Sequence, residues 1–119
     1  MTRVLIVDDS PTEMQLLTNI MEEHGYDVIT AENGEEGVAM AKSSQPDVIL
    51  MDVVMPGMNG FQATRQISKS EETAHIPVII ITTKDQETDR IWGLRQGAKD
   101  FLTKPVQEGK LLTTVRSLV

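Results

Sequence analysis

The chain has 119 residues, which is the size of one ordinary domain and long enough to bury a hydrophobic core. Its 11 basic and 18 acidic residues give a net charge of −7, and no cluster of Lys and Arg stands out along it, which argues against nucleic acid or an anionic membrane as a direct partner. The absence of cysteine excludes disulfides and thiolate chemistry, and no apolar run approaches the roughly 20 residues of a membrane span.

Strand-like runs of apolar and β-branched residues alternate with amphipathic segments along the whole chain. The first run is Arg3–Val7, and a helix start follows at residues 10–13, where a serine cap precedes a proline and a glutamate in the manner of a capping box. Gly25 predicts the end of this helix, and a short strand is expected around residues 28–29. The predicted core stripe of the helix is Met14, Leu17, Ile20 and Met21.

Residues 33–36, Asn-Gly-Glu-Glu, repeat the start signal of a helix, which should end at the Ser-Ser-Gln-Pro of residues 43–46. The third strand, residues 47–51, is apolar without alternation, which is typical of a strand covered on both faces. A loop at residues 55–60 then leads to a short helix that includes Phe61, Ala63 and Ile67.

The remaining chain predicts two more strand and helix pairs. Strands are expected at residues 77–81 and 99–102, and helices at about 86–96, ended by Gly97, and at about 106–118. Five such units without a linker or repeat predict an α/β fold, with a five-stranded, doubly wound parallel sheet and helices on both of its faces.

Polar side chains stand where the predicted strands end. Asp8 and Asp9 follow the first strand, Asp52 follows the third, Thr82 ends the fourth and Lys104 follows the fifth. In open α/β sheets, ligands bind in the crevice outside the carboxyl ends of the strands. An isolated Asp-Asp pair could equally serve the helix start that follows it, but a third carboxylate at an adjacent strand end favours a site.

Several carboxylates in one site repel each other unless a cation neutralises them, and Mg²⁺, which prefers oxygen ligands, is the natural occupant. His24 and His75 lie far apart in the sequence and without a ligand partner, so zinc is not indicated. An aspartate can also attack phosphorus to form an acyl phosphate, and the central Asp52 is the candidate. Thr82 and Lys104 would then bind oxygens of the transferred group, although each alone is explained by strand propensity or solvation.

The ordered set Asp8-Asp9, Asp52, Thr82 and Lys104-Pro105, with Met-Pro-Gly-Met-Asn-Gly after Asp52, resembles a bacterial response-regulator receiver domain of the CheY type. The resemblance covers the whole chain and implies a single receiver domain over residues 1–119. The strand order 2-1-3-4-5 is expected from the known flavodoxin-like fold with this connectivity. More narrowly, residues 8–14, 59–65 and 82–89 resemble a regulator of the chemotaxis-like system that controls type IV pili and twitching motility.

The resemblance also implies the roles of the residues. The phosphoacceptor would take its phosphoryl group from a phosphohistidine of a histidine kinase or its phosphotransfer domain, and an output protein would bind the switched form. The implied residues are Asp52 as phosphoacceptor; Asp9, Asp52 and the Val54 backbone carbonyl as Mg²⁺ ligands, with Asp8 acting mainly through water; Thr82 and Lys104 on the phosphoryl oxygens; Phe101 as the switch aromatic; and a cis bond before Pro105.

The expected output surface is the face formed by helix 86–96, strand 99–102 and the last helix. This face is expected to shift when Thr82 closes on the phosphoryl group. Gly93 weakens that helix by roughly 1 kcal/mol relative to alanine, which suits a moving part. The adjacent Trp92 either reports on the movement or packs in the core. Thr83 and Lys84 depart from the commonest family pattern and bear on the lifetime of the phosphorylated state.

Met55 and Met58 are candidate partner contacts in the loop, because methionine suits adaptable surfaces. We expect a stand-alone, monomeric, cytoplasmic regulator, since no leader-like segment opens the chain and no further module follows the last helix.

Two other classes compete with this interpretation. A phosphatase similar to the haloacid dehalogenases would carry a second aspartate two residues after the nucleophile, where this chain has Val54. A nucleotide- or flavin-binding domain would show a glycine-rich phosphate loop, and neither G-x-G-x-x-G nor G-x-x-x-x-G-K-[ST] occurs.

Overall fold

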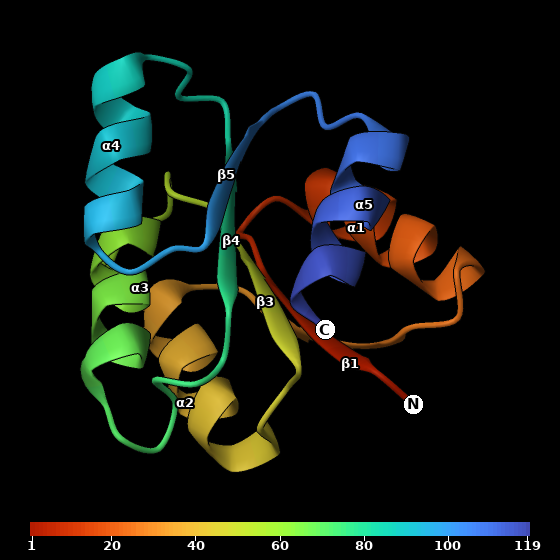
Figure 1. Ribbon diagram of the computed structural model, residues 1–119, viewed down its shortest axis with the longest axis horizontal. Coiled ribbons are helices and arrows are strands. Elements are labelled where there is room, and N and C mark those ends of the chain that lie inside the picture. Colours follow the sequence, from red (N-terminus) through yellow and green to blue (C-terminus); the bar gives the residue numbers. More distant parts are fainter.

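A computed structural model describes residues 1–119, and its centre is a parallel five-stranded sheet in the order β2-β1-β3-β4-β5 (Figure 1). Both the parallel sheet and the strand order agree with the prediction. The crossovers reverse direction between β1 and β3, which is the kind of switch point where open α/β sheets bind ligands. The strands are β1 (Arg3–Val7), β2 (Asp27–Ala31), β3 (Val48–Met51), β4 (Val78–Thr82) and β5 (Asp100–Thr103).

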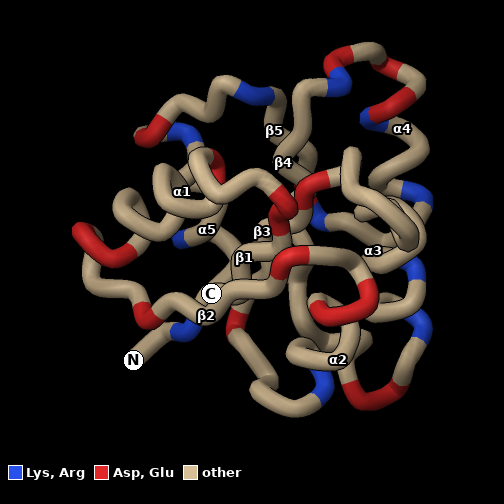
Figure 2. The backbone as a smooth tube through the Cα atoms, turned by 180° about the vertical axis from the view of Figure 1, so that it is seen from behind, with Lys and Arg blue, Asp and Glu red and all other residues tan.

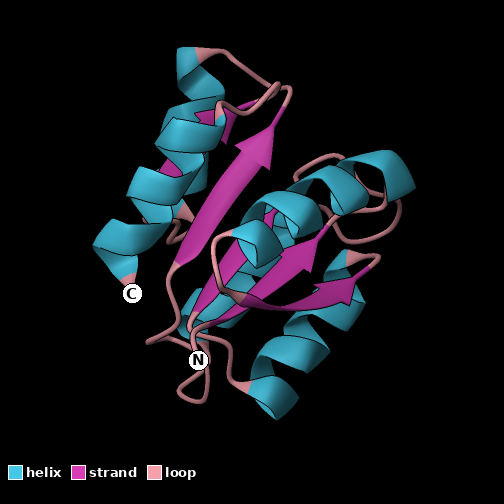
Figure 3. Ribbon diagram, turned by 90° about the vertical axis from the view of Figure 1, so that its right-hand side faces the viewer, coloured by secondary structure: helices cyan, strands magenta, loops and turns pink.

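Five helices cover the sheet in two layers, as Figures 1 and 3 show. Helices α1 and α5 lie on one face, and α2, α3 and α4 lie on the other (Figure 1). None of the helices is long and apolar enough to cross a membrane. Their bounds are α1 (Pro11–Glu23), α2 (Gly34–Ser44), α3 (Gly60–Lys69), α4 (Glu87–Arg95) and α5 (Glu108–Leu118).

The strands supply alternate side chains to two separate cores, because neighbouring residues of a strand point to opposite faces. In β1, Val4 and Ile6 join the core beneath α1 and α5, whereas Leu5 and Val7 join the core beneath α2 and α3. All four are fully buried. The unbroken apolar runs of the sequence thus reflect strands covered on both sides.

Element bounds differ from the predictions mainly at ends. Strand β2 spans five residues rather than two, since it pairs with β1 along its whole length.

The capping box predicted for α1 is half formed: the Ser10 hydroxyl accepts a hydrogen bond from the Glu13 N–H at 3.3 Å. A complete box, not predicted, opens α3, where Asn59 and Gln62 each bind the backbone N–H of the other at 2.9 Å.

The interpretation of Met55 as a partner contact is wrong. Its side chain belongs to the core beneath α2 and α3 and the residue is only 8% exposed, while Met58 is partly buried against the same core. Trp92, in contrast, is 50% exposed on α4 and has no core role.

Candidate functional site

The backbone pairing of the sheet continues past the strands and so positions the polar residues at its carboxyl edge. The Asp8 N–H donates to the Ala31 carbonyl at 3.1 Å, and the Asp52 N–H donates to the Val7 carbonyl at 2.9 Å. On the far side, the Lys104 N–H donates to the Thr82 carbonyl at 2.8 Å. Asp8, Asp52 and Lys104 are therefore each held by the backbone of a neighbouring strand.

Three carboxylates gather at this edge. Ligand oxygens of Asp8, Asp9 and Asp52 all lie within 4.8 Å of one another. Asp8 and Asp52 are buried, while Asp9 is exposed at the mouth of the cluster. Because the chain is already turning into α1, both neighbouring aspartates reach the same crevice. A compact set of hard carboxylate oxygens open to solvent on one side fits Mg²⁺, which commonly keeps several waters.

The Lys104 ammonium lies close to three carboxylates of the site. Its ammonium donates to Asp8 Oδ2 at 2.9 Å and lies 3.6 Å from Asp52 Oδ1 and 3.9 Å from Glu13 Oε2. The lysine side chain is 9% exposed and that of Asp8 is 1% exposed. Glu13 was not among the predicted site residues; its place in the first turn of the helix after Asp8-Asp9 was the available signal.

The surroundings shift the pKa values of both Asp52 and Lys104. Desolvation raises the pKa of the Asp52 carboxyl from 3.8 to about 6, and the charge of Asp8 adds to the rise while Lys104 opposes it. Desolvation alone would lower the pKa of Lys104, but the hydrogen bond to Asp8 and the charge of Asp52 outweigh it and the pKa rises. Lys104 therefore stays charged at neutral pH, and Asp52 is an ionised group held in an unfavourable environment.

Thr82 is fully buried at the end of β4. Its hydroxyl accepts a hydrogen bond of 3.3 Å from the Lys84 N–H and makes no hydrogen bond to the carboxylates. Val54 follows Asp52 by two residues and is 58% exposed. The peptide bond between Lys104 and Pro105 is cis.

Phe101 lies beneath α4 rather than in the crevice. It is 7% exposed and packs with Val53, Ile80 and Ala98, with Phe61 partly buried against them. This small apolar cluster connects the strand ends to α4, because Val53 directly follows Asp52 and Ile80 lies two residues before Thr82.

Two glycines allow close packing that the sequence did not reveal. A side chain at Gly60 would collide with the Asp52 backbone carbonyl, so glycine lets α3 begin directly against the Asp52–Val53 segment. A Cβ at Gly93 would lie 2.9 Å from Ile80 Cδ1 and 3.1 Å from Phe101 Cδ2. Gly93 is the only buried residue of α4, so the helix rests on the sheet through this contact.

Comparison with known proteins identifies the family of the chain. The family model of the response regulator receiver domain matches residues 4–116. The chain is 64% identical over 119 residues to the protein PilH of Pseudomonas aeruginosa, covering all of this chain and 98% of that protein.

Solved structures give the same result. The chemotaxis protein CheY4 of Vibrio cholerae superposes with a TM-score of 0.93 at 33% identity, over 100% of this chain and 99% of that one. The receiver domain of a sensor histidine kinase from Pseudomonas aeruginosa PAO1, solved with a magnesium ion coordinated in its active-site cleft, gives 0.91 at 29% identity, over 98% and 96%. The carboxylate cluster, the fold and these likenesses agree, and the chain belongs to the response regulator receiver domain family.

Proposed function

We propose that residues 1–119 act as one receiver domain that accepts a phosphoryl group on Asp52. The observation that carries this proposal is that Asp52 lies beside two further carboxylates, Asp8 and Asp9, and beside the Lys104 ammonium at one edge of the sheet. An ionised carboxylate with a raised pKa is a better nucleophile than an ordinary aspartate, and it lies beside a fixed cation.

In the proposed reaction, a carboxylate oxygen of Asp52 attacks phosphorus of a phosphohistidine on a kinase or phosphotransfer domain. An oxygen–phosphorus bond forms as the nitrogen–phosphorus bond of the donor breaks, and its electron pair returns to the imidazole. Mg²⁺, held by Asp9, Asp52 and the Val54 carbonyl with Asp8 acting through water, would neutralise charge on the phosphoryl oxygens. Lys104 would pair with one of these oxygens, and the Thr82 hydroxyl with another.

The switch would begin at Thr82. Its hydroxyl now accepts from the Lys84 N–H, and closing on a phosphoryl group would exchange that hydrogen bond and draw in the loop before α4. The buried ring of Phe101 would repack beneath α4 in response, because cores are bistable rather than freely deformable. The face of α4, β5 and α5 would then change for an output protein.

The biological setting is proposed from the 64% identity to PilH. We place the chain in chemotaxis-like control of type IV pili and twitching motility, in the cytoplasm, as a monomer. A kinase supplies the phosphoryl group and an output protein reads the switched face. The spacing after Asp52 continues to disfavour a phosphatase of exogenous esters, because Val54 stands where the acid would be.

The test is intact-mass spectrometry after incubation with magnesium and a small-molecule phosphodonor. One added phosphoryl group is expected in the natural chain, none in Asp52→Asn, and much less in Asp9→Asn or with a chelator. Glu71→Gln, an exposed acid that follows the end of α3 opposite its start beside Asp52, is the control. An adduct that persists in Asp52→Asn, or turnover of phosphate esters, would contradict the proposal.

A further inference from the structure

The charges of this acidic chain are strongly segregated in space. Residues 60–69 and 90–99 contain five of the 11 basic residues and none of the 18 acidic ones. These two segments comprise α3 and most of α4 with the turn after it, and they lie side by side: the Arg65 guanidinium donates to Gln96 Oε1 at 3.5 Å. In Figure 2, blue segments without red ones run along α3 and the adjacent part of α4. The five residues are Arg65, Lys69, Arg90, Arg95 and Lys99.

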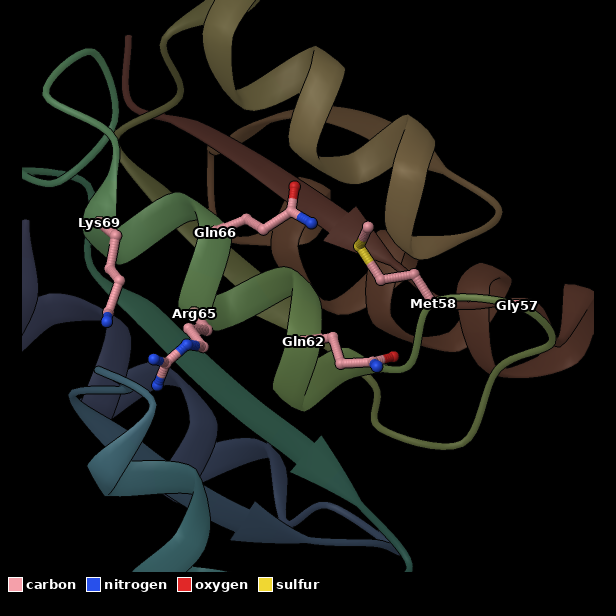
Figure 4. A pocket seen from close by; sticks show the side chains of 6 residues that line it. All are labelled: Gly57, Met58, Gln62, Arg65, Gln66 and Lys69. Atoms are coloured by element: carbon pink, nitrogen blue, oxygen red, sulfur yellow. The ribbon is translucent and has the colours of Figure 1, made fainter.

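These cations have no acidic partners within the molecule. The ion pairs of the structure involve Arg3, Lys84 and Lys104 only. Arg65 and Lys69 are exposed, one helical turn apart, and Figure 4 shows both extending from the same side of α3. Two cations without acidic partners, one helical turn apart, are able to pair with carboxylates of a ligand.

A groove between α3 and α4 accompanies the charge. It encloses about 380 Å³ and is lined by Asn59, Phe61, Gln62 and Arg65 on one side and by Trp92 and Gln96 on the other. A second hollow of about 570 Å³ shares Gln62 and Arg65 with it and extends along α3 to Lys69 (Figure 4). The half-exposed Trp92 and partly buried Phe61 give the groove an apolar wall beside its cations.

This groove is separate from the output surface proposed above. Trp92 and Gln96 lie four residues apart and face α3, whereas Glu87 and Arg90 line the hollow that faces β5 and α5. Helix α4 therefore presents two different sides to solvent. The groove also lies away from the carboxylates, none of which lines it.

We propose that the α3–α4 groove binds an acidic segment of a partner protein that carries one apolar anchor residue. Carboxylates of the segment would pair with Arg65 and Lys69, and the anchor would pack on Trp92 and Phe61. A short segment suits the charge distribution, because the net charge of −7 repels a long polyanion beyond this face. The volume of the groove has room for one or two side chains.

The experiment selects phage-displayed random dodecapeptides on the full chain, with counter-selection on the double variant Arg65→Glu/Lys69→Glu. The most enriched peptide is then synthesised and titrated into ¹⁵N-labelled protein. An acidic sequence with an apolar residue is expected, with saturable shifts in α3 and α4 that include the Trp92 indole. Affinity should fall about 10-fold or more in the double variant and between about 50 and 500 mM salt.

The matched control is Lys110→Glu/Arg116→Glu, which makes the same charge change at exposed positions of α5 and should leave the affinity unchanged. Trp92→Ala should weaken binding, and replacing the apolar residue of the peptide by serine should do the same. Magnesium-dependent phosphorylation of Asp52 is measured in parallel, and it should be equal in all variants. Its failure throughout would reject the proposed receiver chemistry without affecting the groove.

Three results would overturn the groove proposal. One is the lack of an enriched acidic peptide, and another is an affinity that is equal in the two double variants. The third is tighter binding, lost in Arg65→Glu/Lys69→Glu, to vesicles rich in phosphatidylglycerol or to duplex DNA than to any selected peptide. That last result would assign the face to a polyanionic surface instead.

Discussion

Lys104 donates its hydrogen bond to Asp8, at 2.9 Å, and lies farther from Asp52, at 3.6 Å. The ammonium is thus anchored by the more deeply buried of the two carboxylates, 96 residues away in sequence, while Asp52 remains free of a direct hydrogen bond to it. The arrangement keeps the lysine beside the proposed phosphoacceptor and leaves that carboxylate able to react. The same contact makes Lys104 a structural residue as well.

We expect Lys104→Met to destabilise the fold by about 2–4 kcal/mol in the presence of a chelator, because it strands the buried Asp8 carboxylate without a countercharge. Urea unfolding measures the loss. Magnesium should restore more stability to this variant than to the natural chain, since the metal supplies the missing positive charge. Lys110→Met, at an exposed position of α5, is the control; an equal loss there would contradict the explanation.

Asp52→Asn should stabilise the metal-free chain at neutral pH. Because burial raises the pKa of Asp52 from 3.8 to about 6, the folded state binds this proton more tightly than the unfolded state does. The protonated Asp52 side chain therefore contributes its full share of stability below about pH 4, and this share is lost as the pH rises to about 6 and Asp52 ionises in the folded state. Asp52→Asn has no charge to bury, so its free energy of unfolding at pH 7.5 should be higher by roughly 1–2 kcal/mol. This is less than the full pKa shift implies, because solvent at the open side of the crevice screens the charge.

The corresponding measurement is a pair of urea titrations in chelator at about pH 7.5 and about pH 4. The advantage of Asp52→Asn should shrink toward zero at the lower pH, while Glu71→Gln should show no comparable gain at either. A constant advantage across the two conditions would show that the raised pKa is not its cause.

Gly93→Ala should destabilise the chain by about 1 kcal/mol even though alanine is the better helix former by a similar amount. The added methyl group would meet Ile80 Cδ1 and the Phe101 ring at 2.9 and 3.1 Å in a packed core. Gly109→Ala in α5 is the matched control, because its Cβ would meet nothing within 4 Å, and it should stabilise by about 0.5 kcal/mol. Melting temperatures of the two variants that move in the same direction would contradict the steric explanation.

Asn59→Ala should cost about 1 kcal/mol, because it removes the Asn59 side-chain oxygen that accepts from the Gln62 N–H at the start of α3, while the backbone N–H of residue 59 can still donate to Gln62 Oε1. Gln86→Ala is a useful comparison, since Gln86 precedes α4 without any side-chain hydrogen bond and should be close to neutral. Thermal unfolding of both variants measures the difference. Equal costs at the two caps would show that the box contributes nothing at Asn59.

The fold and the edge residues could be predicted because their signals are local. Unbroken apolar runs such as residues 48–51 mark buried strands, and Asp8, Asp52, Thr82 and Lys104 stand at run ends whatever the packing. The error at Met55 arose where packing decides, because Met55 looked like a surface residue in a loop but fills the core. The close approach of Gly93 to Phe101 could not be predicted for the same reason.

By itself, the sequence determined the alternation of strands and helices, the family and the identity of the acids, the hydroxyl and the lysine, because each depends on residue type and spacing along the chain. Only the tertiary structure decided that Lys104 bonds to Asp8, that burial raises the pKa of Asp52, and that the basic segments 60–69 and 90–99 lie side by side. Hydrogen bonding, desolvation and charge clustering depend on distances in space between residues that lie tens of positions apart, and composition or periodicity contains no such distance.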